Sequence, residues 1–128
     1  LLDNSGSWDG VNLVVDNNNI TTTNRRIFNV FNTGSSLTSA QFTNNIITQT
    51  ASPATFSIFL GNLGDTCGYI NNNTIVGGPI RLSQFALGFF EVSPGSAAAM
   101  SAANNGVTVN TFGTINFNAA LPQPQCTP

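Results

Sequence analysis

The stretch that decides the fold is Phe42-Thr43-Asn44-Asn45-Ile46-Ile47-Thr48, because the chain repeats it. The other copies are residues 15–21 (VDNNNIT), 70–76 (INNNTIV) and, less closely, 102–108 (AANNGVT). Successive copies begin 27, 28 and 32 residues apart. Self-similarity at such a period indicates a solenoid, in which each unit buries its apolar face only against its neighbours.

A phenylalanine motif keeps nearly the same spacing. Its copies are residues 28–31 (FNVF), 56–59 (FSIF), 85–87 (FAL) and 115–117 (INF). Because two motifs recur in step, we expect the chain to wind at a near-constant pitch. The first residues of the first three copies, Phe28, Phe56 and Phe85, are then predicted to stack inside the coil.

Each repeat favours strands over helices. Its apolar residues alternate or form short β-branched and aromatic runs, and Asn, Thr, Ser and Gly separate these runs. The sequence therefore predicts an all-β fold, a right-handed parallel β-helix of about four coils with 27–32 residues each. An antiparallel β-sandwich is the alternative.

The paired asparagines are the expected bends, because Asn tolerates the left-handed backbone conformation. We expect their amides to bond the Asn one coil away, as asparagine ladders do between in-register parallel strands. In particular, Asn44, Asn72 and Asn104 are predicted to stack. The full set of predicted ladder residues is Asn17, Asn18, Asn44, Asn45, Asn72, Asn73, Asn104 and Asn105.

The whole chain, residues 1–128, is predicted to be one domain. Residues 1–10 form a lead-in, with Trp8 as a cap over the first coil or an exposed contact, residues 11–118 form the coils, and residues 119–128 form a Pro-rich tail. Residues 96–103 (SAAAMSAA) predict a short helix that begins with Ser96 as its cap. The sequence begins without Met, so we expect a segment of a longer polypeptide.

The repeated frame resembles the right-handed parallel β-helix of pectin-lyase-like proteins and of bacterial surface and autotransporter passenger proteins. Residues 42–45 (FTNN) also resemble the Phe-x-x-Asn tetrapeptide of polymorphic outer-membrane proteins. Residues 77–80 (GGPI) are similar to the Gly-Gly-apolar-apolar motif of the same proteins, although Pro79 departs from it. The resemblance covers about residues 11–117 and implies a segment of a bacterial protein that is extracellular or on the cell surface.

Composition excludes several classes of function. Charged residues are 6% of the chain and its net charge is −2, so no nucleic-acid partner is expected. The adjacent Arg25 and Arg26 are interpreted as a solvated bend. The sequence contains no run of about 18 apolar residues, so no transmembrane helix is expected in this segment. The chain has no histidine, and its cysteines match no zinc motif, so neither a metal nor a cofactor is expected.

Two pairs of residues leave alternatives open. Cys67 and Cys126 form a disulfide that ties the tail to the third coil, or they are two unpaired thiols. Phe89 and Phe90 form an exposed contact patch, or they pack in the core.

No catalytic residue is predicted. Enzymes that cleave glycans use paired carboxylates, whereas in the repeat register Asp16 faces Thr43 and Asn71. A nucleophile activated by histidine is excluded by composition.

Three functions fit these observations. The preferred hypothesis is a non-catalytic structural or adhesive segment of a bacterial cell-surface or secreted protein, an adhesin that contacts glycans, host proteins or copies of itself through amides and hydroxyls. The first alternative is a carbohydrate-active β-helix, either a polysaccharide lyase or hydrolase or a phage tailspike fragment. The second alternative is a filament subunit that assembles through open strand edges.

Overall fold

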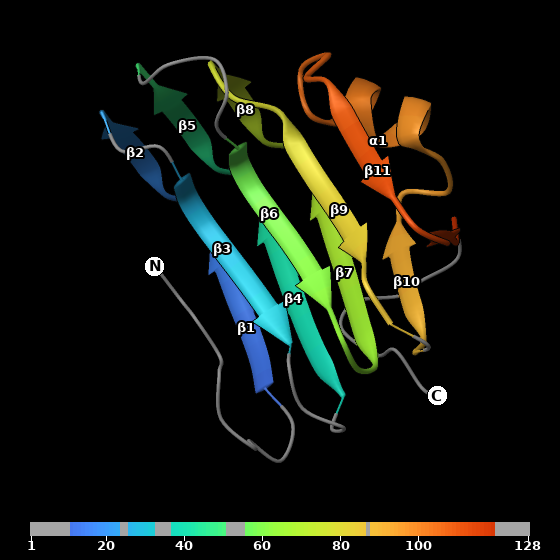
Figure 1. Ribbon diagram of the computed structural model, residues 1–128. Helices are drawn as coiled ribbons and strands as arrows, with labels where there is room; N and C mark the ends of the chain where they lie inside the picture. The colour runs from blue at the N-terminus through green and yellow to red at the C-terminus, as the bar shows by residue number, and fades with distance from the viewer. Residues whose placement is uncertain (1–10, 24–25, 33–36, 51–55, 87, 120–128) are drawn as a thin grey trace.

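A computed structural model of the protein describes residues 11–23, 26–32, 37–50, 56–86 and 88–119. In this part of the chain, twelve strands form three parallel sheets, and there is one short helix (Figure 1). The five-stranded sheet has the order β1 (Val11–Asp16), β4 (Thr38–Thr43), β7 (Thr66–Asn71), β10 (Phe90–Ser93) and β12 (Asn116–Phe117). The four-stranded sheet has the order β11 (Val109–Phe112), β9 (Ile80–Gln84), β6 (Phe56–Asn62) and β3 (Arg26–Asn32). The three-stranded sheet has the order β2 (Asn19–Thr22), β5 (Ile46–Gln49) and β8 (Thr74–Val76).

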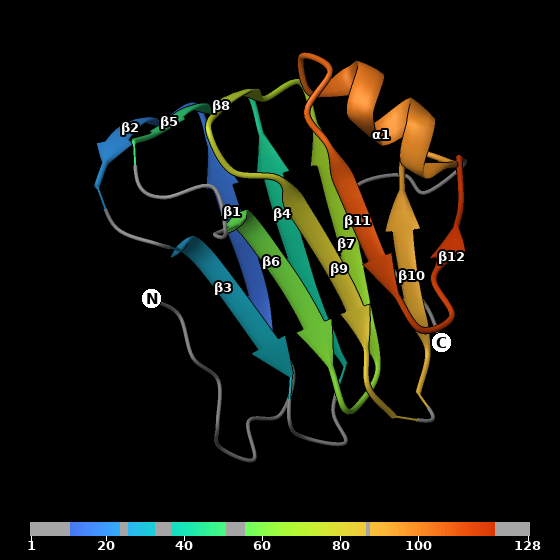
Figure 2. The ribbon, with the colours of Figure 1, turned by 45° about the horizontal axis from the view of Figure 1, so that its top comes forward.

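Each full turn of the chain contributes one strand to each sheet, so the fold is a parallel β-solenoid of about three turns. A fourth turn begins with β10 in the five-stranded sheet and continues with β11 in the four-stranded sheet. Between them lies the helix α1 (Ala97–Ala103), where earlier turns have a strand of the three-stranded sheet. Figure 2 shows α1 beside β11, at the end of the stack. The predicted solenoid is confirmed, and the sandwich alternative is wrong because every strand pair in the described residues is parallel.

The helix follows from its sequence. Alanine and methionine are good helix formers, and Ser96 caps the first turn by accepting a hydrogen bond from the backbone N–H of Ala99 at 3.0 Å. Met100 is fully buried in the core, which attaches α1 to the end of the solenoid. The helix predicted over residues 96–103 is confirmed.

The asparagine frame sets the register of the first three turns. Val15 lies opposite Phe42, and Phe42 opposite Ile70. Their side chains point inward, where Phe42 and Ile70 are fully buried. Between the five-stranded and three-stranded sheets, the chain bends at residues with a left-handed backbone, as predicted. These residues are Asn17, Asn44 and Asn72, with φ of 55°, 56° and 55°.

In the first three turns the second asparagine of each pair turns inward, and these residues form the inner ladder together with Asn104. The Nδ2 of Asn18 donates to Oδ1 of Asn45 at 3.0 Å, Asn45 to Asn73 at 2.8 Å, and Asn73 to Asn104 at 2.7 Å. Asn45, Asn73 and Asn104 are buried, so this ladder satisfies polar groups that water cannot reach. The first asparagines form a shorter outer ladder, in which the Nδ2 of Asn72 donates to Oδ1 of Asn44 at 2.7 Å.

The prediction that Asn104 stacks on Asn72 is wrong. The Asn104 side chain instead bonds Asn73, whose Nδ2 donates to its Oδ1 at 2.7 Å, while the Asn72 N–H donates to the carbonyl of Ala103 at 2.8 Å. The next residue, Asn104, then turns inward, and its Nδ2 donates to the carbonyls of Met100 and Ile70. Asn105 has the left-handed φ of 60°, but it follows the inward asparagine instead of preceding it.

The predicted internal row of Phe28, Phe56 and Phe85 is also wrong. Phe28 lies opposite Ile58, Phe56 lies opposite Arg26, and Phe85 follows β9 with 50% of its surface exposed. The reason is that the loops between sheets differ in length. Positions that pair on the four-stranded sheet are 30 residues apart at Phe28 and Ile58 but only 22 apart at Ile58 and Ile80.

Candidate functional site

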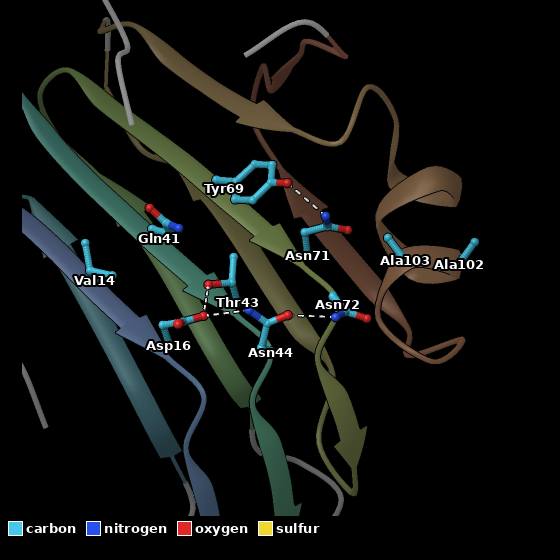
Figure 3. Close-up of a pocket in the computed structure, with 10 residues that line it drawn as sticks. All are labelled: Val14, Asp16, Gln41, Thr43, Asn44, Tyr69, Asn71, Asn72, Ala102 and Ala103. Atoms are coloured by element: carbon cyan, nitrogen blue, oxygen red, sulfur yellow. Dashed lines mark hydrogen bonds between the residues drawn. The ribbon is translucent and has the colours of Figure 1, made fainter. Parts of the chain in front are cut away.

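A polar groove lies on the outer surface of the five-stranded sheet, near the ends of β1, β4 and β7 (Figure 3). Its volume is about 770 Å³. Ligand sites of proteins commonly fall between about 300 and 1,000 Å³. The lining residues are Val14, Asp16, Gln41, Thr43, Asn44, Tyr69, Asn71, Asn72, Ala102 and Ala103.

Strand alternation directs these side chains outward. Successive residues of a strand point to opposite faces, so the residues on either side of the inward Phe42 face the groove. These are Gln41 and Thr43, and register brings Tyr69 and Asn71 beside them on β7. On β1, Val14 and Asp16 occupy the same two rows. The groove floor is therefore two rows of three outward side chains, one residue from each turn.

Asp16 carries the groove's negative charge. Its Oδ1 accepts hydrogen bonds from Thr43 Oγ1 at 2.5 Å and from Asn44 Nδ2 at 2.7 Å. The Thr43 bond first and the Asn44 bond second lower the pKa of Asp16 below its ordinary value of 3.8, against a smaller opposing effect of desolvation. Asp16 is therefore ionised at neutral pH.

The outer ladder continues from Asp16 along the groove. Asn44 donates to Asp16 and accepts from Asn72, so the amides of two successive turns are held in fixed orientations (Figure 3). Both amides are exposed. This row presents pre-oriented polar groups at the coil spacing of about 4.8 Å.

Tyr69 supplies an aromatic surface. Its hydroxyl accepts a hydrogen bond from Nδ2 of Asn71 at 2.8 Å, two residues along the same strand. A hydroxyl in that position requires the ring to lie along the strand instead of standing away from it. Ala102 and Ala103 of α1 bound the groove next to β7 (Figure 3), so the helix that ends the solenoid also closes one side of the site.

The other described carboxylates lie outside the groove. Asp65 accepts a hydrogen bond from the backbone N–H of Phe89 at 2.8 Å, and Glu91 accepts one from Asn118. Asp16 is thus the single carboxylate among the ten lining residues. The predicted row of Asp16, Thr43 and Asn71 is confirmed. Within the described residues, no cluster of three or more His, Cys, Asp or Glu residues could hold a metal ion.

The other predicted residues that the structure describes are not part of the groove's lining. Cys67 is on β7 and is disulfide-bonded, while Cys126, its predicted partner, lies outside the described residues. Phe90 is fully buried in the core and offers no exposed contact, and Phe89 is half-buried. Trp8 and the Pro-rich tail also lie outside the described residues.

Two features were not predicted. The first is the contribution of Gln41 and Tyr69 to the groove. The sequence does contain a signal for them: each directly precedes an inward apolar residue, Phe42 or Ile70, so strand alternation directs it outward. The second is an outer aromatic row on the four-stranded sheet, formed by ring contacts of 5.4–6.2 Å among Phe31, Phe56, Phe59, Phe85 and Phe112.

Comparison of the chain with protein-family models, with curated proteins and with solved structures gives no match. The chain is therefore assigned by its fold, as a parallel β-solenoid with a polar groove on its side. No helix in the described ranges is both long and apolar enough to cross a membrane.

Proposed function

We propose that the chain is a non-catalytic structural and adhesive segment of a bacterial cell-surface or secreted protein, and that it binds glycans in the groove. The observation that carries the proposal is the row of Asp16, Asn44 and Asn72, whose polar groups are fixed beside the ring of Tyr69. Sugar hydroxyls both donate and accept hydrogen bonds, and such a row offers partners of both kinds.

The polar groups retain capacity for a ligand. Both hydrogen bonds to Asp16 end on Oδ1, which leaves Oδ2 to accept from a hydroxyl. The Tyr69 hydroxyl accepts from Asn71 and still has its own proton to donate. Since these orientations exist before binding, a ligand does not have to order them, which reduces the entropic cost of association.

Apolar surface accompanies these groups. Val14 is 53% exposed at one side of the groove, and Ala102 is exposed at the other. Together with the Tyr69 ring they can cover the apolar faces of a saccharide. Because the groove is open and mainly polar, we expect weak binding at one site and useful strength only when several copies act together.

Scaffold features support the structural part of the proposal. The inner ladder satisfies the buried amides of successive turns and holds the groove strands in register. Gly77, in the motif that resembles polymorphic outer-membrane proteins, has a φ of 113°, and a Cβ there would lie 2.2 Å from the Gln49 carbonyl oxygen. A glycine is therefore required at this turn. The proposed surface location rests on that resemblance.

The test is a glycan array probed with the purified chain, followed by calorimetric titration of the glycans that bind. Tyr69→Ala and Gln41→Ala remove groove side chains and should each weaken binding by about tenfold, the equivalent of 1.4 kcal/mol. Thr111→Ala, an exposed change on β11 of another sheet, is the matched control and should leave affinity unchanged. An array without any bound glycan, or equal binding by all four proteins, would contradict the proposal.

A further inference from the structure

We infer that the groove selects neutral, hydroxyl-rich saccharides and disfavours acidic ones such as uronates and sulfated glycans. This inference rests on the proposed glycan-binding function and specifies its ligand class. It is carried by the charge of the lining residues and by the direction of their hydrogen bonds.

The donors nearest the charge are already engaged. The Thr43 hydroxyl and one N–H of the Asn44 amide point at Asp16. One N–H of Asn72 points at Asn44 in turn. An anionic ligand has acceptors to be satisfied, and it would compete with Asp16 for the same donors. A neutral saccharide instead brings hydroxyl protons, which Asp16 Oδ2 and the amide oxygens can accept.

No cation compensates for Asp16 among the lining residues. The chain has three arginines and no lysine or histidine. Arg81 lies on β9 of the four-stranded sheet, where its guanidinium donates to Ser83 at 2.9 Å and stands 5.8 Å from the centre of the Phe112 ring. Arg26 begins β3 of that same sheet, and Arg25 is outside the described residues.

Electrostatics gives the expected size of the effect. A ligand carboxylate within a few ångström of Asp16 is repelled by an amount that corresponds to about tenfold in affinity at a solvent-exposed site. Salt weakens this repulsion, because the Debye length is about 10 Å at 0.1 M ionic strength. Selectivity for neutral glycans should therefore be largest at low salt.

The experiment is calorimetric titration at 20 mM and 300 mM NaCl with two sets of probes. The neutral probes are cellohexaose, mannohexaose, chitohexaose and fully methyl-esterified hexagalacturonate, and the acidic probes are hexagalacturonate, hexamannuronate and a heparin hexasaccharide. The esterified and free hexagalacturonates differ only at the carboxyl groups, which are methylated and neutral in the ester and ionised in the acid. We expect neutral probes to bind, and the matched ester to bind about tenfold more tightly than the acid at low salt.

Three variants isolate the charge. Asp16→Asn should bring the ester-to-acid affinity ratio close to one, and Gln41→Glu, which adds a second carboxylate, should increase it. Thr111→Asp adds the same charge on another sheet and should leave the ratio as in the parent chain. Thermal unfolding of each variant establishes that it is folded.

The outcomes separate the two proposals. Tighter binding of acidic than neutral probes, or an ester-to-acid ratio that Asp16→Asn does not change, overturns the inference and leaves glycan binding intact. Binding of none of the seven probes, together with an empty glycan array, overturns the proposed function and the inference with it.

Discussion

Asn45 and Asn73 are joined through a single oxygen. The backbone N–H and the side-chain Nδ2 of Asn45 both donate to Oδ1 of Asn73, at 3.0 Å and 2.8 Å. The same two bonds join Asn73 to Asn104 and Asn18 to Asn45. One side chain per turn thus satisfies the backbone of the bend before it in the stack, which explains why the asparagine repeats where other polar residues vary.

Removal of one rung of the inner ladder should be strongly destabilising. Asn73→Ala leaves the N–H and Nδ2 of Asn45 and the carbonyl of Phe42 without their buried partner. Each unsatisfied buried group costs about 1–3 kcal/mol, so the free energy of unfolding should fall by about 3–5 kcal/mol. Urea denaturation followed by circular dichroism measures this loss.

The matched control is the neighbouring outer asparagine. Asn72 is exposed and has a φ of 55°, so Asn72→Gly removes one solvent-accessible bond while it keeps the backbone conformation accessible. It should cost about 1 kcal/mol or less. Equal losses for Asn73→Ala and Asn72→Gly would contradict the distinction between inner and outer ladders.

A second prediction concerns the turn at Gly77. Gly77→Ala would place a Cβ 2.2 Å from the carbonyl oxygen of Gln49, which is backbone of the preceding turn and cannot move aside. We expect a loss of about 3 kcal/mol or more, because the clash adds to the strain of the positive φ. Gly106→Ala has a positive φ of 71° with nothing within 4 Å, and it should cost only about 1–2 kcal/mol. Thermal unfolding of the two variants in parallel would reveal the difference, and similar midpoints would argue against the turn geometry.

The asparagine frame was sufficient to predict the first three turns from the sequence. Its register held from Val15 through Ile70 because the bend and the strands on either side of it have a constant length. The row of Asp16, Thr43 and Asn71 followed directly from that register. The helix over residues 96–103 was predictable as well, since its cap and its alanines act locally.

The phenylalanine row failed for a physical reason. A spacing of about 28 residues predicts stacking only if every loop between sheets keeps its length, and the loops that lead to the four-stranded sheet do not. Phe28 nevertheless packs inside, where its ring centre lies 5.2 Å from that of Phe42 on the facing sheet. Phe31, Phe59 and Phe112 alternate outward instead. All of these residues are phenylalanines, so residue type alone could not distinguish the inward ones from the outward ones.

The groove could not be predicted from the sequence, and the reason differs from that for the phenylalanine row. Its floor follows from strand alternation, but one boundary is α1, whose position depends on how Met100 packs into the end of the core. Asn104, which directly follows this helix, bonds Asn73 of the inner ladder instead of stacking on Asn72 as predicted. Tertiary contacts of this kind have no local signature, so neither the groove nor the ladder shift could be read from spacing.

A third prediction uses the two phenylalanine sets. Phe42 is fully buried between sheets, so Phe42→Ala should lower the free energy of unfolding by about 3–5 kcal/mol. Phe112, at 51% exposure, contacts Phe85 at the surface, and Phe112→Ala should cost about 1 kcal/mol or less. Chemical denaturation distinguishes the two, and a larger loss at Phe112 would mean that the outward and inward faces of the sheets are reversed.

The fourth prediction is the pH dependence at Asp16. Its folded-state pKa is depressed by the hydrogen bonds from Thr43 and Asn44, so its contribution to stability is fully present above its ordinary pKa of 3.8. That contribution is lost as pH falls through the lower folded-state pKa. Relative to Asp16→Asn, the parent chain should therefore lose stability below about pH 4.

NMR titration of the Asp16 carboxyl carbon measures the same effect directly. The midpoint should lie below 3.8, and Thr43→Val should move it upward, because the bond that lowers the pKa most is then absent. A midpoint at or above 3.8 in the parent chain, unchanged by Thr43→Val, would be incompatible with the hydrogen bonds in the groove.

The central claim is that successive turns stack with the inner asparagines in contact, and scalar coupling across hydrogen bonds tests it most directly. A long-range HNCO experiment on the folded chain should correlate the backbone amide nitrogen of Asn45 with the side-chain carbonyl carbon of Asn73, and that of Asn73 with Asn104. Correlation of the Asn45 amide with a different residue, while strand hydrogen bonds are detected elsewhere, would show that the turns do not stack in this register.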